Sequence, residues 1–181
     1  YRGDALDVEF IDLNPDTDYI VFTYHIDLTN SMLIGDVYRD TVRSGKPAQI
    51  DTTFDMTLTV NNNVITQTIK ASNEDTYYYT GYWKVSDFYT YYGRDAVMEE
   101  TFPAKWNETV IIQMSYGKTL AQIIEEFCKK GSQTIENTSL ANYTEYAFFI
   151  FAIDPATGFA ASDTATDTAT TTSVHDSGAT I

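Results

Sequence analysis

The chain has 181 residues, a formal net charge of −15 and a single cysteine. Hydrophobic residues make up 43% of it and aromatic residues 14%, which is enough for a folded core and excludes a disordered tail. The negative charge argues against nucleic acid as a partner. One cysteine excludes a disulfide framework and a cysteine-based zinc site. No apolar run approaches the roughly 20 residues of a membrane-spanning helix.

The two ends carry little structural signal. The chain starts at Tyr1 without methionine or signal peptide, which suggests a mature product or a piece of a longer protein. Arg2-Gly3-Asp4 matches an integrin-adhesion tripeptide, but so short a match at a terminus favours coincidence. Residues 173–181 have few apolar anchors and are typical of a linker or tail.

The segment before the boundary at residue 46 predicts three strands, at residues 5–10, 20–26 and 36–42. The turn between the first two contains Pro15, a residue type common in turns. Three strands that share one apolar face are marginally stable alone. We therefore expect missing upstream sequence, the second unit or another copy of the chain to complete this unit.

The residues after the interruption at Gly45-Lys46-Pro47, the expected domain boundary, are patterned as strands. Apolar and polar residues alternate in the first of these strands, and β-branched residues dominate the second. An aromatic strand, a short strand, an apolar run and a last strand follow. The six expected strands span residues 54–60, 64–70, 76–85, 133–137, 147–153 and 159–168.

An insert at residues 86–130 separates the third and fourth of these strands and has helical patterns. Its clearest helix, residues 120–130, has an apolar stripe, and Gly131 follows it as a helix-ending residue. Thr119 and Gln122 fit a capping box at its start. We expect the insert to cover an open face or edge of a sheet and to protect that edge from pairing.

Two further helices are expected earlier in the insert. Ser86-Asp87 would cap the first, which ends at residue 92. The second spans residues 95–102 and should end at Pro103, because proline disrupts a helix interior. Residues 106–114 favour neither state, since their β-branched run indicates a strand and their surroundings do not.

A repeat connects the two parts of the chain. Leu13-Asn-Pro-Asp-Thr-Asp-Tyr19 and Leu140-Ala-Asn-Tyr-Thr-Glu-Tyr146 share Leu, Thr, an acidic residue and Tyr, and each precedes an apolar run that ends in Ile-Asp. The two copies align without a gap, from Leu13 with Leu140 to Asp27 with Asp154. A tyrosine after a turn can bury its ring and bond its hydroxyl to the upstream backbone, which is the tyrosine corner of immunoglobulin-like sandwiches.

On these motifs the sequence resembles fibronectin type III-like domains, and more narrowly the tandem type III-like domains of surface lipoproteins from Gram-negative gut bacteria. The turn Asp154-Pro-Ala-Thr-Gly158 fits the same family, whereas Asn142 replaces the usual proline of the corner. The structural corner residues are Leu13, Pro15, Thr17, Tyr19, Leu140, Thr144 and Tyr146.

The resemblance implies a mainly β fold: an Ig-like, fibronectin type III-like β-sandwich with a helical insertion between strands C and E, preceded by an incomplete second sandwich unit. Residues 1–46 would be the C-terminal part of one repeat (strands E, F and G), and residues 47–172 a domain with its insert at 86–130. It implies a non-catalytic structural or interaction module of an extracellular or cell-surface protein, an outer-membrane lipoprotein whose signal is not in this chain.

No pattern in the chain predicts a catalytic residue, a cofactor or a metal site. Asp12, Asp16 and Asp18 supply oxygen ligands, but their spacing does not match a calcium-binding loop, and a solvated turn is favoured. A catalytic triad needs a histidine beside a nucleophile and an acid, whereas His25 is expected on a strand surface and His175 in the tail. Cys128 is expected to be a semi-buried thiol rather than a nucleophile.

The tyrosine-rich segment is the strongest candidate for binding. Alternation places Tyr78, Thr80 and Tyr82 on one face of a strand and Tyr77, Tyr79, Gly81 and Trp83 on the other. One of these faces belongs to the core, and the other is either covered by the insert or open to solvent, where its aromatic side chains form a platform for a glycan or a protein partner. The candidate platform residues are Tyr78, Tyr82, Trp83, Tyr89, Tyr91 and Tyr92.

Overall fold

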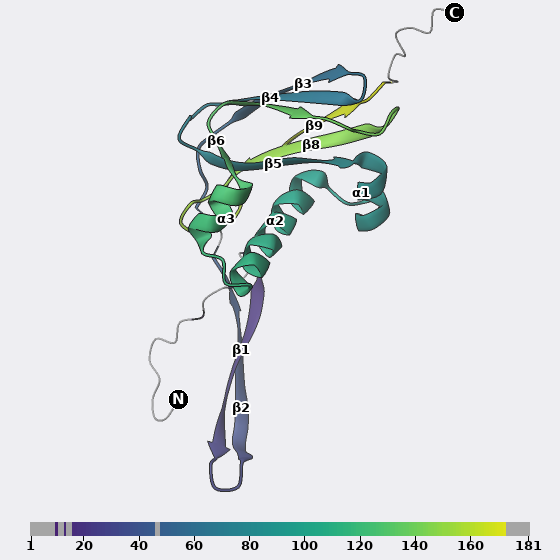
Figure 1. Ribbon diagram of the computed structural model, residues 1–181. Coiled ribbons are helices and arrows are strands. Elements are labelled where there is room, and N and C mark those ends of the chain that lie inside the picture. Colours follow the sequence, from purple (N-terminus) through teal and green to yellow (C-terminus); the bar gives the residue numbers. More distant parts are fainter. Residues whose placement is uncertain (1–9, 11–12, 14–15, 46–47, 173–181) are drawn as a thin grey trace, which may run out of the picture. The chain divides into compact units, whose positions relative to one another are not determined.

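The computed structural model describes residues 10, 13, 16–45 and 48–172. The chain divides into two compact units, residues 1–46 and 47–181, and both are built on antiparallel β-sheets (Figure 1). The strand expected at residues 5–10 lies outside the described residues except for Phe10, and so does the tail at 173–181. None of the described helices has the length and apolar character that crossing a membrane requires.

The first unit contains a two-stranded antiparallel sheet of β1 (Asp18–Asp27) and β2 (Met32–Arg43). The strands predicted at residues 20–26 and 36–42 lie within them and are confirmed. Asp27 shapes the turn between the strands, because its carboxylate accepts hydrogen bonds from the backbone N–H of Thr29 at 2.8 Å and from Nδ2 of Asn30 at 2.7 Å. These hydrogen bonds also lower the pKa of Asp27, the Thr29 bond most.

The second unit contains two antiparallel sheets packed face to face, an arrangement consistent with a β-sandwich (Figure 1). The three-stranded sheet has the order β3-β4-β7 and the four-stranded sheet the order β6-β5-β8-β9. The strands are β3 (Phe54–Asn61), β4 (Val64–Ala71), β5 (Tyr77–Lys84), β6 (Lys129–Lys130), β7 (Gln133–Asn137), β8 (Glu145–Ala152) and β9 (Ala165–Thr170).

Alternate residues of these strands form the core between the two sheets. Ile65 and Ile69 of β4 lie against Phe148 and Ile150 of β8, and all four are fully or almost fully buried. One polar side chain, Gln67, is also buried there, and its Nε2 donates to Oγ1 of Thr80 at 2.9 Å across the sheets. Burial of alternate residues is the arrangement expected of a strand with one face toward a core.

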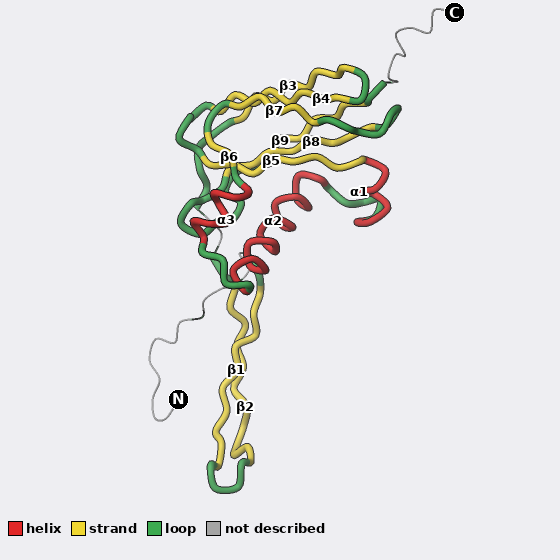
Figure 2. Tube along the Cα trace, viewed as in Figure 1, coloured by secondary structure: helices red, strands yellow, loops and turns green. Residues whose placement is uncertain are grey.

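Three helices form a layer on the other face of the four-stranded sheet (Figure 2). They are α1 (Val85–Tyr92), α2 (Met98–Ser115) and α3 (Leu120–Phe127), and they lie between β5 and β6 in the chain. Phe149 of β8 stacks on Phe102 of α2 with ring centroids 3.9 Å apart. Trp106 of α2 stacks on Tyr79 of β5 at 4.3 Å, so the helices cover a face of the sheet.

Helix α2 differs from the sequence-based expectation at its end and includes a segment that the sequence left unassigned. It continues through Pro103 instead of ending there, and it includes residues 106–114, whose state the pattern did not indicate. A proline inside a helix costs about 3 kcal/mol. Here Phe102, Trp106 and Val110 recur every fourth residue and are all buried, and burial of one such side chain stabilises by about 1.5–3 kcal/mol.

The boundaries of the two other helices also differ from the prediction. The capping box of Thr119 and Gln122 is confirmed at the start of α3, but the helix ends at Phe127, because the next residues extend and pair with β5 as β6. Lys130, which lies beyond the end of the helix, has its Nζ 2.9 Å from Oδ1 of Asp75. Helix α1 begins at Val85 without a side-chain cap, so the Ser86-Asp87 cap is wrong.

The hairpin β1–β2 repeats the hairpin β8–β9 in its backbone geometry. In β1–β2 the pairs run from Asp18↔Arg43 to Thr23↔Tyr38, and in β8–β9 from Glu145↔Thr170 to Ile150↔Ala165. Each residue of the β8–β9 pairs comes after its counterpart in β1–β2 by the same number of positions as Leu140 comes after Leu13. The register then shifts at the same place in both copies, since Ile26 pairs with Leu33 and Ile153 with Ala160.

The turns at the two ends of these hairpins repeat as well. Asp16 and Tyr143, the residues just before the shared threonines of the two motifs, both have φ of 49°. Asp27 accepts from the backbone two residues on, at 2.8 Å, and Asp154 does the same at 2.9 Å. Ser31 and Gly158 complete these turns with φ of 53° and 76°. The repeat therefore extends well beyond the segment in which the sequence motif shows it.

Candidate functional site

The second corner of the repeat is formed by the side chains predicted for it. The hydroxyl of Tyr146 accepts a hydrogen bond from the backbone N–H of Ala141 at 2.9 Å, and the ring is buried. Leu140 is buried in the same cluster. The backbone N–H of Thr144 donates to Oγ1 of Thr171 at 3.0 Å. These residues act structurally, because they attach the start of β8 to the loop before it and to the end of β9.

The first corner shares the part of this geometry that lies in the described residues. The backbone N–H of Thr17 donates to Oγ of Ser44 at 3.0 Å, which is the counterpart of the Thr144–Thr171 contact in the second unit. Leu13 and Tyr19 line a small apolar cavity of about 260 Å³ together with Phe10. Pro15 lies outside the described residues.

The strongest candidate for a binding site is an aromatic surface at the end of β5, which we define as Tyr82, Trp83, Lys84, Asp87 and Tyr91. Tyr82 is 38% exposed, Trp83 36% and Tyr91 76%. All five residues line one open depression of about 480 Å³, whose other walls are Ser139, Leu140 and Tyr146. The site is therefore concave and has both aromatic and charged groups.

The exposed rings of the aromatic surface are held by ring contacts with the core. Tyr82 packs edge-on against Tyr146 with centroids 5.7 Å apart. Trp83 packs edge-on against Tyr91 at 6.2 Å and lies against Tyr92 at 5.5 Å. Rings fixed in this way lose little conformational entropy when a ligand binds, which favours binding.

The position of this surface follows from the short pairing of β6. Strand β6 pairs with Tyr77 and Tyr78 only, so in the described residues the rest of β5 has no strand on that side. Tyr82 and Trp83 alternate to the two faces of β5 and are both exposed at this open edge. Lys84 and Asp87 form a loose ion pair, with Nζ 4.0 Å from Oδ2.

Three of the six predicted platform residues line this depression, and three do not. Tyr78 is fully buried and packs edge-on against Phe54 at 5.3 Å, so its place in the platform is wrong. Burial also raises the pKa of Tyr78 to about 12. Tyr89 is exposed but does not line the depression, and Tyr92 is partly buried beneath Trp83. The predicted alternation of faces along β5 is confirmed.

The arrangement suits a ligand with flat apolar faces and polar edges. The exposed rings of Trp83 and Tyr91 offer area for contact with the C–H face of a sugar or with an apolar side chain. Lys84 supplies hydrogen-bond donors, and Asp87 supplies acceptors. Sequence reasoning missed these two charged residues, although Lys84 follows directly on Trp83 and the spacing from Lys84 to Asp87 matches one helical turn.

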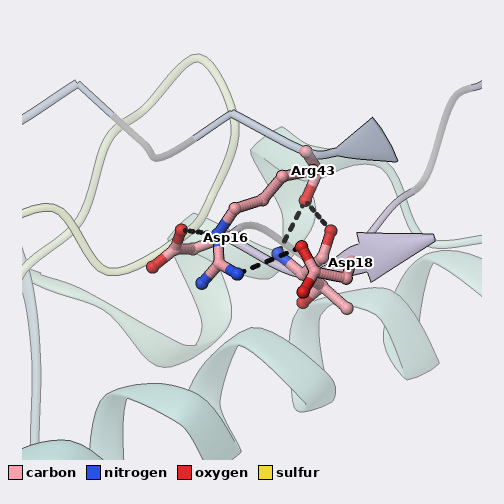
Figure 3. Close-up of polar contacts among 5 residues, drawn as sticks. Asp16, Asp18 and Arg43 are labelled. Atoms are coloured by element: carbon pink, nitrogen blue, oxygen red, sulfur yellow. Dashed lines mark hydrogen bonds and ion pairs between the residues drawn. The ribbon is translucent and has the colours of Figure 1, made fainter. Parts of the chain in front are cut away.

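The acidic residues predicted as a solvated turn are engaged by an arginine (Figure 3). Arg43 places its Nε 2.7 Å from Oδ1 of Asp16 and its Nη1 3.1 Å from Oδ1 of Asp18. Asp16 is the main cause of the raised pKa of Arg43. Asp12 lies outside the described residues. Within the part of the chain that is described, no cluster of three metal-ligating side chains occurs.

The remaining candidates have structural surroundings of ordinary kinds. His25 is exposed on β1. Cys128 is buried at the end of α3, and burial raises the pKa of its thiol to about 12, so it carries almost no thiolate at neutral pH. Arg2, Asp4 and His175 lie outside the described residues.

No protein-family model matches this chain, and a comparison with curated proteins finds no match either. The chain is therefore characterised by its structure: it has two antiparallel β units, and the second unit has a helical layer and an aromatic surface.

Proposed function

We propose that the chain is a non-catalytic extracellular module, made of tandem fibronectin type III-like units, that serves a structural or interaction role in a cell-surface lipoprotein. The observation that carries the proposal is the repeated corner and hairpin, which recur in the same register at one constant spacing along the chain. A corner and hairpin that recur at the spacing of a whole domain are expected where sandwich domains follow one another in tandem.

The strand order of the second unit supports the type III-like assignment. If β3, β4 and β7 are strands A, B and E, then β5, β8 and β9 are strands C, F and G, which are the two sheets of an Ig-like sandwich. The Tyr146–Ala141 bond then lies where a tyrosine corner belongs, just before strand F. In this assignment the three helices form an insertion between strands C and E.

The use of the aromatic residues supports a structural role for the helical layer. Fold alone does not imply function, so the packing matters here. Phe88, Phe102 and Trp106 are buried against the four-stranded sheet, and Nε1 of Trp106 donates to the backbone oxygen of Gly158 at 2.8 Å. These side chains cover the sheet and fix the loop after β8.

Cell-surface exposure of the protein that contains this chain is the test of the proposal. Cells of a Gram-negative bacterium that express the full protein are treated with a protease that does not cross the outer membrane, and the protein is followed with an antibody to residues 48–172. The proposal predicts digestion in intact cells and incorporation of labelled palmitate. Protection in intact cells together with release in the cytosolic fraction would refute it.

A glycan-binding role is the second candidate, and the exposed aromatic surface favours it. The full chain and its Trp83→Ala and Tyr91→Ala variants are compared on an array of polysaccharides. Glycan binding predicts retention that both variants weaken, whereas Tyr116→Ala, a change at an exposed tyrosine outside the depression, leaves it unchanged. The absence of any retained polysaccharide would reject this candidate and leave the structural role.

A further inference from the structure

The hairpins β1–β2 and β8–β9 share their geometry but not their surroundings. Ile20 and Phe22 of β1 are 68% and 59% exposed, whereas their counterparts in β8, Ala147 and Phe149, are 0% and 5% exposed. In β8 these positions are covered because β5 pairs along the strand and the helices pack on its face. Among the described residues β1 pairs with β2 alone. The same apolar pattern therefore lies open in the first unit.

The ladder defines which backbone groups of β1 face away from β2. The backbone N–H of Ser44 donates to the oxygen of Thr17 at 2.9 Å, so these two residues form a hydrogen-bonded pair. Hydrogen-bonded and non-hydrogen-bonded pairs alternate along an antiparallel ladder. Even-numbered residues, Ile20 and Phe22 among them, therefore direct their N–H and C=O groups to the edge opposite β2.

The equivalent edge of β8 shows what such an edge binds. Ile153 lies on the strand edge that corresponds to that of Ile20 and Phe22, and its backbone N–H donates to the oxygen of Tyr77 at 2.8 Å. Along β5, the side chains opposite this edge are Tyr79, Gly81 and Trp83, paired with Phe151, Phe149 and Ala147. Space at the glycine is tight, since a Cβ atom on Gly81 would lie 3.0 Å from Cζ of Phe149 and the ring would have to move by a few tenths of an ångström.

We propose that the open edge of β1 is a strand-acceptor site for a partner polypeptide with the chemistry of β5. The partner strand binds antiparallel along Ile20, Phe22 and Tyr24, with a glycine opposite Phe22 and aromatic residues two positions to either side. Backbone hydrogen bonds supply the affinity and the side-chain pattern supplies the specificity, as in other cases of β-strand addition. The inference rests on the proposed interaction role and names the surface and the partner.

A second copy of the chain does not fit this site. Its own β5 is already paired with β8, and its β1 has no glycine to place opposite Phe22. Two copies would also bring together chains that each carry a net charge of −15, which opposes association. The partner is therefore a strand from outside this sequence.

The test uses the full chain, labelled with ¹⁵N, and a synthetic peptide with the sequence of residues 76–85 extended by lysines for solubility. A two-stranded sheet is marginally stable alone, so the amides of Ile20 and Phe22 should exchange quickly in the free chain. The peptide should slow both by about tenfold or more once bound, since each then donates to a partner backbone. A peptide with Gly81→Val should bind about tenfold more weakly, because the added side chain overpacks the space opposite Phe22.

A chain variant separates specific pairing from general stickiness. In Phe22→Ala the space opposite the glycine opens, so the two peptides should bind with similar affinity. Equal binding of both peptides to the unchanged chain would overturn the proposal, as would protection of Val21 and Thr23 in place of Ile20 and Phe22. Protection in the chain alone, with a doubled mass in sedimentation, would show a second copy at the site and overturn it as well. None of these outcomes depends on cell-surface location, so the proposed function is tested separately.

Discussion

The substitution Tyr146→Phe tests whether the corner stabilises the second unit. It removes one oxygen atom, which accepts a hydrogen bond from the backbone N–H of Ala141 at 2.9 Å, and leaves the buried ring in place. A net hydrogen bond contributes about 0.5–1.5 kcal/mol, and a donor left unsatisfied costs about 1–3 kcal/mol. We expect a loss of about 1–2 kcal/mol in the free energy of unfolding.

Urea unfolding followed by tryptophan fluorescence measures this loss, because both tryptophans, Trp83 and Trp106, lie in the second unit. In a domain of this size, a loss of about 1 kcal/mol lowers Tm by roughly 3–5 °C. Tyr143→Phe is the matched control, since Tyr143 lies in the same turn but is exposed. If Tyr146→Phe were as stable as the control, the hydroxyl would not stabilise the corner, and the reasoning would be refuted.

Two further predictions concern the helical layer. Gly158→Ala should lower the free energy of unfolding by about 2–5 kcal/mol, because the residue has φ of 76° and its Cβ would lie 2.4 Å from Cδ1 of Leu120. Gly117→Ala is the control: with φ of 87° and open space around its Cβ, it should lower the free energy of unfolding by only about 1 kcal/mol. Equal losses in the two variants would contradict a role for the contact with Leu120. Burial raises the pKa of Cys128 from 9.0 to about 12, so the folded state keeps this proton to a higher pH than the unfolded state does. The stability that this proton contributes is fully present below pH 9. It should fall by about 1.4 kcal/mol per pH unit between about pH 9 and 12. Urea titrations at stepwise pH should show that the free energy of unfolding declines less steeply with pH in Cys128→Ala than in the unchanged chain. The same slope in both would contradict the prediction.

Most strands of the second unit could be predicted from the sequence because their pattern is local, but the last one, expected at residues 159–168, is found at Ala165–Thr170. Apolar residues alternate along β3, β-branched residues dominate β4, and residues 133–137 form β7 as expected. Only the start of helix α2, residues 98–102, was predicted, because Pro103 and the run from Val110 to Ile112 oppose a helix locally. The buried contacts of Phe102 and Trp106 with the sheet outweigh that local preference, and the sequence does not show such contacts.

The candidate site was predicted in part for the same reason. Alternation along β5 separates Tyr78 from Trp83, but it does not say which face is covered by a second sheet and which by helices. The sandwich covers Tyr78, and the short β6 leaves Tyr82 and Trp83 at an open edge. The length of β6 depends on where α3 ends, which the sequence places too late.

In the sequence the repeat was found only from the corner to the Ile-Asp that ends the apolar run. Asp40-Thr41 of β2 recurs as Asp167-Thr168 of β9, and in each pair the aspartate accepts from the next backbone N–H at 2.8 Å. Two matching residues in a stretch of small and polar side chains are too weak a signal by themselves. The common register of the two hairpins places these residues at equivalent positions, which makes them part of the repeat.

The most direct test of the account is a set of cross-strand nuclear Overhauser effects in the labelled chain. Non-hydrogen-bonded pairs bring opposite Cα atoms to about 4.5 Å, where their Hα atoms give strong signals. The account predicts Hα–Hα signals for Ile20–Thr41 and Phe22–Arg39, and equally for their counterparts in the second unit, Ala147–Thr168 and Phe149–Thr166. Signals that place the first hairpin in another register, with the second as described, would contradict the claim that one unit occurs twice.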